Sequence, residues 1–158
     1  MKGICLSSII YDSKVLEYID RVDYTDSFET KVSSGETIKE LYLELVNSKS
    51  KTTDFLMYIR NKIMSIFGVK TVDKNINDDF TVGSKIGLFK IYYISDTEII
   101  AGEKDWHLDF CVSFFKKDDK VMLSTIVKYN NGFGKIYMNI IKPFHKLLVK
   151  NSLKKLNK

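Results

Sequence analysis

The densest group of side chains that could do chemistry lies in the segment 102–110. Its polar members occur at every second position, and they are Glu103, Asp105, His107 and Asp109. If the segment is one strand, these four side chains point to the same face of a sheet, because successive side chains alternate between the two faces. The alternate residues then face the core, and these are Trp106, Leu108, Phe110, Val112 and Phe114.

Three interpretations of this polar row are open. His107 and Asp109 could ligate a metal ion, but no further ligand stands at a diagnostic spacing from them. His107 could act as an acid or base that is oriented by Asp105 or Asp109. The row could also be a solvated face with ion pairs to lysines of other strands, which is the default interpretation. We therefore predict neither a metal nor a cofactor, and we treat Glu103, Asp105, His107 and Asp109 as candidate catalytic residues only.

Two further side chains are candidates for a site. Arg60 lies in the middle of a predicted helix, where it could pair with an acidic strand residue or face a ligand carboxylate. His145 lies near the start of the terminal helix, where a capping or buried hydrogen-bonded role is the default. The sequence contains no phosphate-binding loop, dinucleotide fingerprint or nucleophile elbow.

The positive charge of the chain is concentrated at its carboxyl end. The formal net charge is +5, and residues 111–158 carry 11 basic and 2 acidic groups. From Lys142 to Lys158, a lysine recurs at every fourth residue, which predicts a basic stripe along a helix. The stripe could contact phosphate or an anionic membrane, or it could be the solvated face of a core helix. Arg21 and Arg60 are the only arginines, so we predict no nucleic-acid partner.

The hydrophobic pattern predicts a strand, two helices, a meander of five strands and a terminal helix. The first strand covers 24–32. The first helix covers 37–46, where Thr37 and Glu40 have the spacing of a capping box, and the second covers 54–68, capped by Asp54 and ended by Gly68. The meander strands cover 88–94, 97–102, 106–116, 120–129 and 133–141, with short turns between them. Pro143 is expected to open the terminal helix.

This order of elements predicts an α+β fold of the helix-grip kind. A curved antiparallel sheet has one apolar face, and a long C-terminal helix can cover it. The chain has 158 residues, so we expect 1–158 to form a single domain. It contains no apolar run long enough for a transmembrane segment and no secretory signal, so we expect a cytoplasmic protein.

Several blocks of the sequence resemble one family, in the same order. They are D-Y-x-D-x-F at 23–28, Y-I-R-N-x5-F-G at 58–68, G-E-x-D-x-H-L-D-F-x-V-S at 102–113, Asn130 with Gly134 and Tyr137, and P-F-H-K-L-L-V at 143–149. The family is the bacterial one catalogued as domain of unknown function 2867. The resemblance implies a helix-grip fold like that of the START and Bet v 1 superfamily. It implies no established reaction and no catalytic residue.

The leading functional prediction is the binding of a small apolar or amphipathic molecule. A curved sheet and a straight helix leave room between them, and the chain is rich in aromatic residues. The candidate ligand-binding residues are Arg60, Phe89, Ile91, Tyr93, Phe110, Tyr137, Phe144, His145 and Leu148. The alternatives are an enzyme that uses His107 with Asp105 or Asp109, and a non-catalytic interaction module that uses the basic C-terminal helix. We expect a binding protein rather than an enzyme, and none of these features indicates an oligomeric state.

Overall fold

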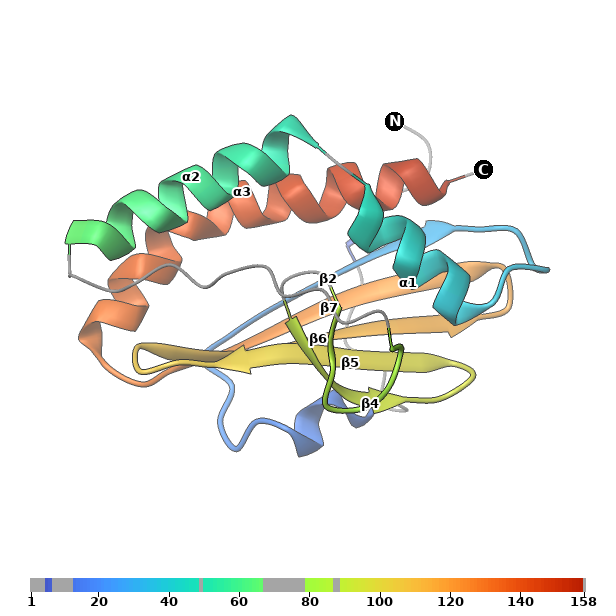
Figure 1. Cartoon of the computed structure of the whole chain (residues 1–158), viewed down its shortest axis with the longest axis horizontal. Helices are drawn as coiled ribbons and strands as arrows, with labels where there is room; N and C mark the ends of the chain where they lie inside the picture. Colours follow the sequence, from blue (N-terminus) through green and yellow to red (C-terminus); the bar gives the residue numbers. More distant parts are fainter. Residues whose placement is uncertain (1–4, 7–12, 49, 67–78, 87–88, 158) are drawn as a thin grey trace.

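The fold is one antiparallel sheet with helices on both faces (Figure 1). The computed structural model describes residues 5–6, 13–48, 50–66, 79–86 and 89–157. The strands are β1 (Cys5–Leu6), β2 (Tyr24–Lys31), β3 (Lys85–Ile86), β4 (Phe89–Ile94), β5 (Glu98–Lys104), β6 (Leu108–Lys117) and β7 (Lys120–Tyr129). The helices are the 3-10 helix η1 (Lys14–Glu17) and the α-helices α1 (Ile38–Asn47), α2 (Lys51–Ile66) and α3 (Gly132–Leu156).

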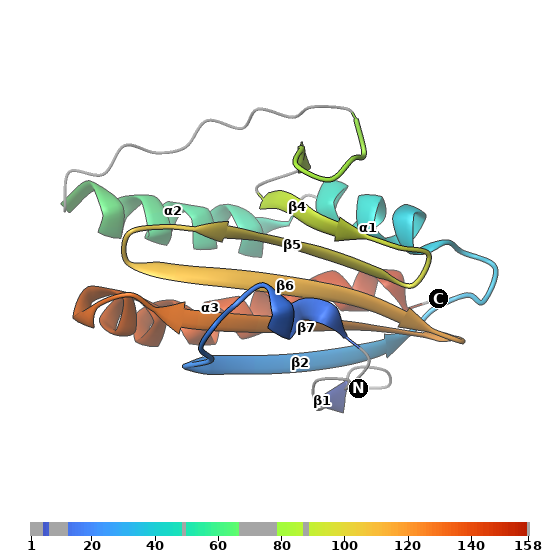
Figure 2. The same ribbon diagram turned by 90° about the horizontal axis from the view of Figure 1, so that it is seen from below.

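The strands lie in the order β1-β2-β7-β6-β5-β4-β3, and neighbouring strands are antiparallel. The three α-helices cover one face of the curved sheet, and η1 lies on the other face (Figure 2). Along the sequence, the long α3 comes after the last strand, and α1 and α2 come directly after β2. This is the predicted α+β helix-grip arrangement.

The helix starts follow from local capping. Thr37 accepts a hydrogen bond from the backbone N–H of Glu40 at 3.3 Å, and the Glu40 carboxylate accepts one from the N–H of Thr37 at 2.8 Å. This capping box starts α1 as predicted. The side chain of Asn131 accepts from the N–H of Gly134 at 3.0 Å and starts α3. The second helix begins at Lys51 rather than at Asp54, and its predicted stop at Gly68 lies outside the described residues.

The predicted strand 133–141 is wrong, because these residues form the first part of α3. Tyr137 and Ile141 are buried one helical turn apart, whereas Ile136 and Ile140 are exposed. Such burial at a spacing of four belongs to a helix and not to a strand. Pro143 therefore lies inside α3 instead of opening it.

Within the described residues, the space between the sheet and the α-helices contains two apolar clusters. The larger one joins buried residues of α1, of the sheet and of the C-terminal part of α3, among them Leu41, Phe28, Phe114, Val149 and Leu153. The smaller one lies at the N-terminal part of α3 and includes Met64, Leu108, Val127, Tyr137 and Ile141. Side chains of α3 pack against the sheet in both clusters.

A third apolar cluster lies on the opposite face of the sheet, under η1. It contains Val15, Ile19, Ile100, Cys111 and Ile126. Burial raises the pKa of the Cys111 thiol to about 11, so this thiol is protonated and unreactive at neutral pH. Among the described residues, none of the helices is long and apolar enough to cross a membrane.

Candidate functional site

The polar row predicted in the segment 102–110 is interrupted by a turn. β5 ends at Lys104 and β6 begins at Leu108, and the N–H of Asp105 donates to the carbonyl oxygen of Leu108 at 3.1 Å. Glu103 is paired with Phe110 and Lys104 with Asp109, so Glu103 and Asp109 lie on opposite faces of the sheet. The expectation of one shared face is therefore wrong.

The same turn exchanges the environments of two neighbouring residues. His107 is buried, whereas Trp106, predicted to face the core, is 47% exposed. A turn breaks the alternation on which the prediction depended, so positions before and after it no longer share a face. Leu108, at the start of β6, again packs in the core as predicted.

His107 lies in an aromatic cluster between this turn and α3. Its ring meets that of Tyr137 edge-on with the ring centres 4.9 Å apart, and Trp106 stacks on Phe133 at 5.0 Å. Nδ1 of His107 is 3.6 Å from a carboxylate oxygen of Asp105, beyond hydrogen-bond distance.

Burial lowers the pKa of His107, the Asp105 carboxylate opposes this shift, and the positive charge of Arg60 adds to it. The net direction is downward, so His107 is neutral at pH 7. Burial also raises the pKa of Tyr137, and Arg60 acts against that shift. The structure thus brings four sequence-predicted residues, Arg60, Asp105, His107 and Tyr137, to one end of α3.

A second polar cluster lies on the covered face of the sheet, at β2 and β7. It consists of Tyr24 and Asp26 on β2, Thr125 on β7 and His145 on α3. Nε2 of His145 is 3.1 Å from the hydroxyl oxygen of Thr125 and 3.7 Å from Oδ1 of Asp26. The hydroxyl of Tyr24 donates to the other carboxylate oxygen of Asp26. Asp26 is only 6% exposed, and its Oδ1 has no hydrogen-bond partner among the described residues.

The charge of Asp26 is maintained despite its burial. Burial acts to raise the pKa of this carboxyl, but His145, the Tyr24 hydroxyl and Lys146 outweigh it, so the pKa lies below its ordinary value. Burial and the adjacent carboxylate raise the pKa of Tyr24, which keeps its hydroxyl protonated and able to donate. Asp26 is therefore an ionised hydrogen-bond acceptor in the interior at neutral pH.

The strand register places Asp26 at the end of a row that crosses the sheet. Asp26 is paired with Thr125, Thr125 with Val112, and Val112 with Ala101. Directly paired residues of antiparallel strands share a face. Asp26 lies between the two apolar clusters, since Phe28 belongs to one of them and the half-buried Tyr24 packs against the other, whereas Ala101 belongs to the larger cluster and Val112 packs against it. The helix side of this row thus combines small side chains with one buried charge.

Eight of the nine predicted ligand-binding residues lie on the helix side of the sheet or in α2 and α3. Phe89 and Phe110 meet edge to face with ring centres 4.9 Å apart, and Ile91 is fully buried beside Ala101. In α3, the half-buried Phe144 packs against Phe55 of α2 rather than against the sheet. The remaining members on this side are Arg60, Tyr137, His145 and Leu148.

Tyr93 is the exception among these residues. It is paired with Ile100 and packs in the apolar cluster under η1, with the ammonium group of Lys14 5.0 Å from the centre of its ring. The structure therefore separates Tyr93 from the other eight residues by the thickness of the sheet.

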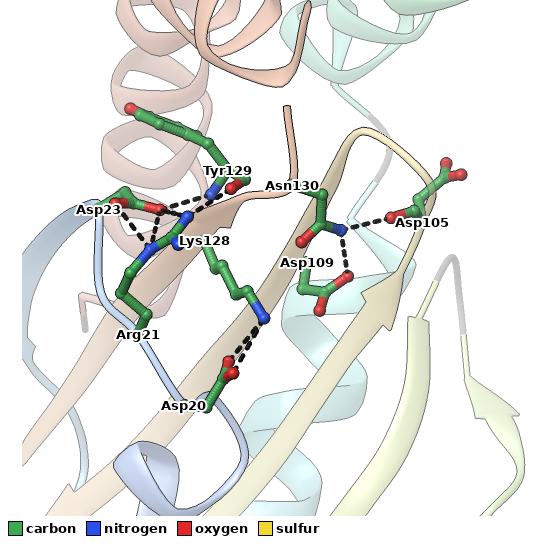
Figure 3. Close-up of polar contacts among 8 residues, drawn as sticks. All are labelled: Asp20, Arg21, Asp23, Asp105, Asp109, Lys128, Tyr129 and Asn130. Carbon is green, nitrogen blue, oxygen red and sulfur yellow. Dashed lines mark hydrogen bonds and ion pairs between the residues drawn. The ribbon is translucent and has the colours of Figure 1, made fainter. Parts of the chain in front are cut away.

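Asp109 belongs to a polar network on the η1 face (Figure 3). The side-chain amide of Asn130 donates to Asp109 at 2.9 Å and to the carbonyl oxygen of Asp105 at 2.7 Å. Lys128 binds both carboxylate oxygens of Asp20, at 2.8 and 3.0 Å. This network ties the end of β7 to the hairpin of β5 and β6 and to the segment that precedes β2. Asp109 is thus engaged away from His107.

A polar depression of about 380 Å³ lies beside this network. Its lining residues are Leu16, Glu17, Tyr18, Ile19, Asp20, Lys104, Asp109 and Lys128. Two of its charged side chains, Asp20 and Lys128, are already paired with each other. It lies on the face of the sheet opposite to α3.

Comparison with models of protein families identifies the chain. Residues 18–152 match the family described as "Protein of unknown function (DUF2867)". The chain belongs to this family. The resemblance predicted from the sequence blocks is thus confirmed, and the DUF2867 match includes both the His107 and the Asp26 cluster. Neither the curated proteins nor the solved structures that were searched contain a match to the chain.

Sequence reasoning missed the roles of Tyr24, Asp26 and Thr125. A signal for Asp26 was present, because it stands two residues after Tyr24 and two before Phe28 in a predicted strand. An acidic residue on the apolar face of a strand is unusual and indicates a buried charge with a specific environment. Thr125 carried no such signal, since threonine is common in strands.

Proposed function

We propose that this DUF2867 protein binds a small amphipathic molecule between the sheet and α3, with the polar group of the ligand at Asp26. The helix-grip arrangement is compatible with such a site. The cluster of Asp26, Thr125 and His145 lies where the sheet and α3 face each other, and apolar side chains adjoin it on both sides.

The observation that supports this proposal is the buried, ionised carboxylate of Asp26, whose Oδ1 lies 3.7 Å from Nε2 of His145 and has no hydrogen-bond partner among the described residues. Burial of a charge is costly, and most buried polar atoms in proteins have hydrogen-bond partners. His145, the Tyr24 hydroxyl and Lys146 stabilise the charge, but none of them donates a hydrogen bond to Oδ1, and the aliphatic Val112 and Ala101 cannot donate one. A ligand that donates a hydrogen bond to Oδ1 would use this remaining acceptor.

The chemistry of the cluster selects the head group of the ligand. An ionised carboxylate accepts hydrogen bonds and attracts positive charge, so an amine or a hydroxyl suits it and a carboxylate does not. The apolar part of the ligand would lie against Val112 and Ala101. Because side chains of α3 already pack against the sheet, ligand binding requires some of these side chains to move.

The proposal is tested with three ligands that share one alkyl chain, namely decylamine, decanol and decanoate. We expect the amine and the alcohol to raise the thermal unfolding temperature and to bind in calorimetry, and decanoate to bind at least tenfold more weakly because Asp26 repels it. Asp26→Asn should abolish the preference for the amine. Asp54→Asn, which removes an exposed carboxylate from α2, is the matched control and should leave the preference unchanged.

Two results would contradict this proposal. One is the absence of binding for all three ligands. The other is a preference for decylamine that survives in the Asp26→Asn variant, which would place the amine somewhere else on the protein.

A further inference from the structure

The outer surface of α2 and α3 exposes an unusual number of large hydrophobic side chains. In the described part of the chain, ten such side chains are exposed, and six of them belong to these two helices. The six are Phe55, Tyr58, Ile66, Ile136, Ile140 and Leu147. Figure 1 shows α2 and α3 lying side by side as a layer over the sheet, so their outer sides form one surface, which we call the helical face.

On α3 the exposed residues form a line. Ile136, Ile140 and Leu147 are 62%, 45% and 50% exposed, and the exposed Pro143 lies between the last two. Spacings of four, three and four residues keep these side chains on one side of a helix. The line points away from the sheet, because Tyr137 and Ile141 of the same helix are buried against it.

On α2 the exposed residues adjoin this line. Phe55 and Tyr58 are 51% and 58% exposed, and the ring of Phe55 contacts that of Phe144 on α3 with centres 5.6 Å apart. The apolar surfaces of the two helices are thereby joined. An apolar surface that spans two helices is larger than the single exposed residues that any soluble protein shows.

The helical face also carries basic side chains. Together α2 and α3 contain nine basic residues and one acidic residue, whereas the whole chain has a net charge of only +5. The rest of the protein is therefore net acidic. Lys51 and Lys62 are exposed on α2, and Lys135 and Lys154 are exposed on α3, whereas the ammonium group of Lys150 lies over the ring of Phe28 on β2. Lysines thus accompany the apolar side chains on both helices.

We infer that the helical face docks on the surface of an anionic lipid membrane, with α2 and α3 parallel to the bilayer plane. The exposed apolar side chains enter the boundary between head groups and acyl chains, and the lysines contact lipid phosphates. A second copy of the chain is a poor occupant of this face, since the exposed lysines of the two copies repel each other. This inference does not depend on ligand binding at Asp26.

The experiment is flotation of the purified full-length chain with vesicles. One vesicle contains phosphatidylcholine alone, and the other contains phosphatidylcholine with about 30 mol% phosphatidylglycerol. We expect binding to the second vesicle only and release at high salt. The variant Lys51→Gln/Lys135→Gln/Lys154→Gln should bind on the order of a hundredfold more weakly, because each lysine near an anionic surface contributes.

A second variant tests the apolar contribution. Ile136→Gln/Ile140→Gln/Leu147→Gln keeps all charges and replaces only exposed side chains, and we expect at least tenfold weaker binding. Two matched controls should bind as the native chain does, and they are Lys31→Gln/Lys90→Gln/Lys117→Gln and Leu16→Gln/Val22→Gln/Val82→Gln.

Three outcomes would overturn the inference. The first is a lack of binding to either vesicle. The second is salt-sensitive binding to soluble polyglutamate with the same affinity as binding to the vesicles. If the apolar variant also binds polyglutamate unchanged, the partner of this face is an acidic protein. The third is a stable dimer in sedimentation velocity that the apolar variant dissociates, which would indicate a second copy of the chain.

Discussion

Asp26 and His107 are both buried titratable side chains, and their neighbours produce different charge states. His145, the Tyr24 hydroxyl and Lys146 favour the ionised form of Asp26 and outweigh its burial. For His107, burial dominates over the attraction of Asp105, so the neutral form is favoured. The difference arises because Lys146 on α3 places a positive charge near Asp26 and Tyr24 on β2 donates a hydrogen bond to it. His107, in contrast, is surrounded mainly by aromatic rings.

The lowered pKa of His107 predicts a loss of stability at mildly acidic pH. Between the folded pKa and the ordinary value of about 6.5, the unfolded chain binds more protons than the folded one, so the free energy of unfolding falls as pH falls. One site contributes at most about 1.4 kcal/mol per pH unit. Urea unfolding at about pH 7.5 and about pH 5.5 measures this fall, and it should be smaller in His107→Gln.

His145→Gln provides the comparison for this measurement, because it removes the other histidine and leaves His107 in place. We expect this variant to keep the part of the pH dependence that His107→Gln removes. An equal fall in the native chain and in His107→Gln would show that His107 has the same pKa in both states.

At the scale of elements, α3 begins in direct contact with the turn between β5 and β6. A Cβ on Gly134 would lie 1.9 Å from the carbonyl oxygen of His107, a distance that real structures do not show. The side chain of Asn131 donates to the carbonyl oxygen of Trp106 at 3.0 Å, at the same junction. The absence of a side chain at Gly134 therefore lets the first turn of α3 approach the sheet.

Gly134→Ala should therefore destabilise the protein by roughly 3 kcal/mol, because the backbone of the turn or the helix has to shift. Gly132→Ala is the matched control, since a Cβ there meets no atom within 4 Å. This control lies in the same helical turn and should be neutral or slightly stabilising. Urea unfolding measures the free energy of unfolding of both variants. A loss only in Gly134→Ala shows that the close contact at this position requires glycine, and equal stability of the two variants would exclude the close contact.

The elements that could be predicted are those with a clear local signal. Thr37 and Glu40 identified the start of α1, and β7 has the predicted bounds. Residues 133–141 of α3 are predicted as a strand, because nothing in their apolar content shows that Ile136 and Ile140 are exposed while Tyr137 and Ile141 are buried. The capping side chain of Asn131 was the available correction. The Asp26 cluster could not be predicted as a whole, because its members are up to 121 positions apart (Tyr24 to His145). They meet only through the register of β2 on β7 together with the packing of α3 on these strands.

For the molecule as a whole, charge and packing divide the protein in different ways. The charge is asymmetric, with α2 and α3 basic and the remainder net acidic. The packing is continuous, because α3 contributes to both apolar clusters on its side of the sheet. The basic helix α3 therefore packs in the same core as the net acidic remainder of the protein.

This continuity predicts a single cooperative unfolding transition for residues 1–158. Leu153 is fully buried in the larger cluster, near the C-terminal end of α3, and Trp106 stacks on Phe133 at the other end. Leu153→Ala should lower the free energy of unfolding by about 2–5 kcal/mol, because it leaves a cavity in the core. Trp106 is the only tryptophan, so its fluorescence reports on the distant end of α3, while far-UV circular dichroism reports on all elements.

We expect Leu153→Ala to shift the urea midpoints of both probes equally, since a two-state domain loses all its structure in one transition. Leu147→Ala, the same chemical change at a half-exposed position of the same helix, is the control and should stay within about 0.5 kcal/mol of the native chain. If the fluorescence midpoint stays in place while the dichroism midpoint falls, the two apolar clusters unfold separately. The polar cluster of Asp26, Thr125 and His145, which adjoins both apolar clusters, would then be a boundary between two folding units rather than a polar site within one core.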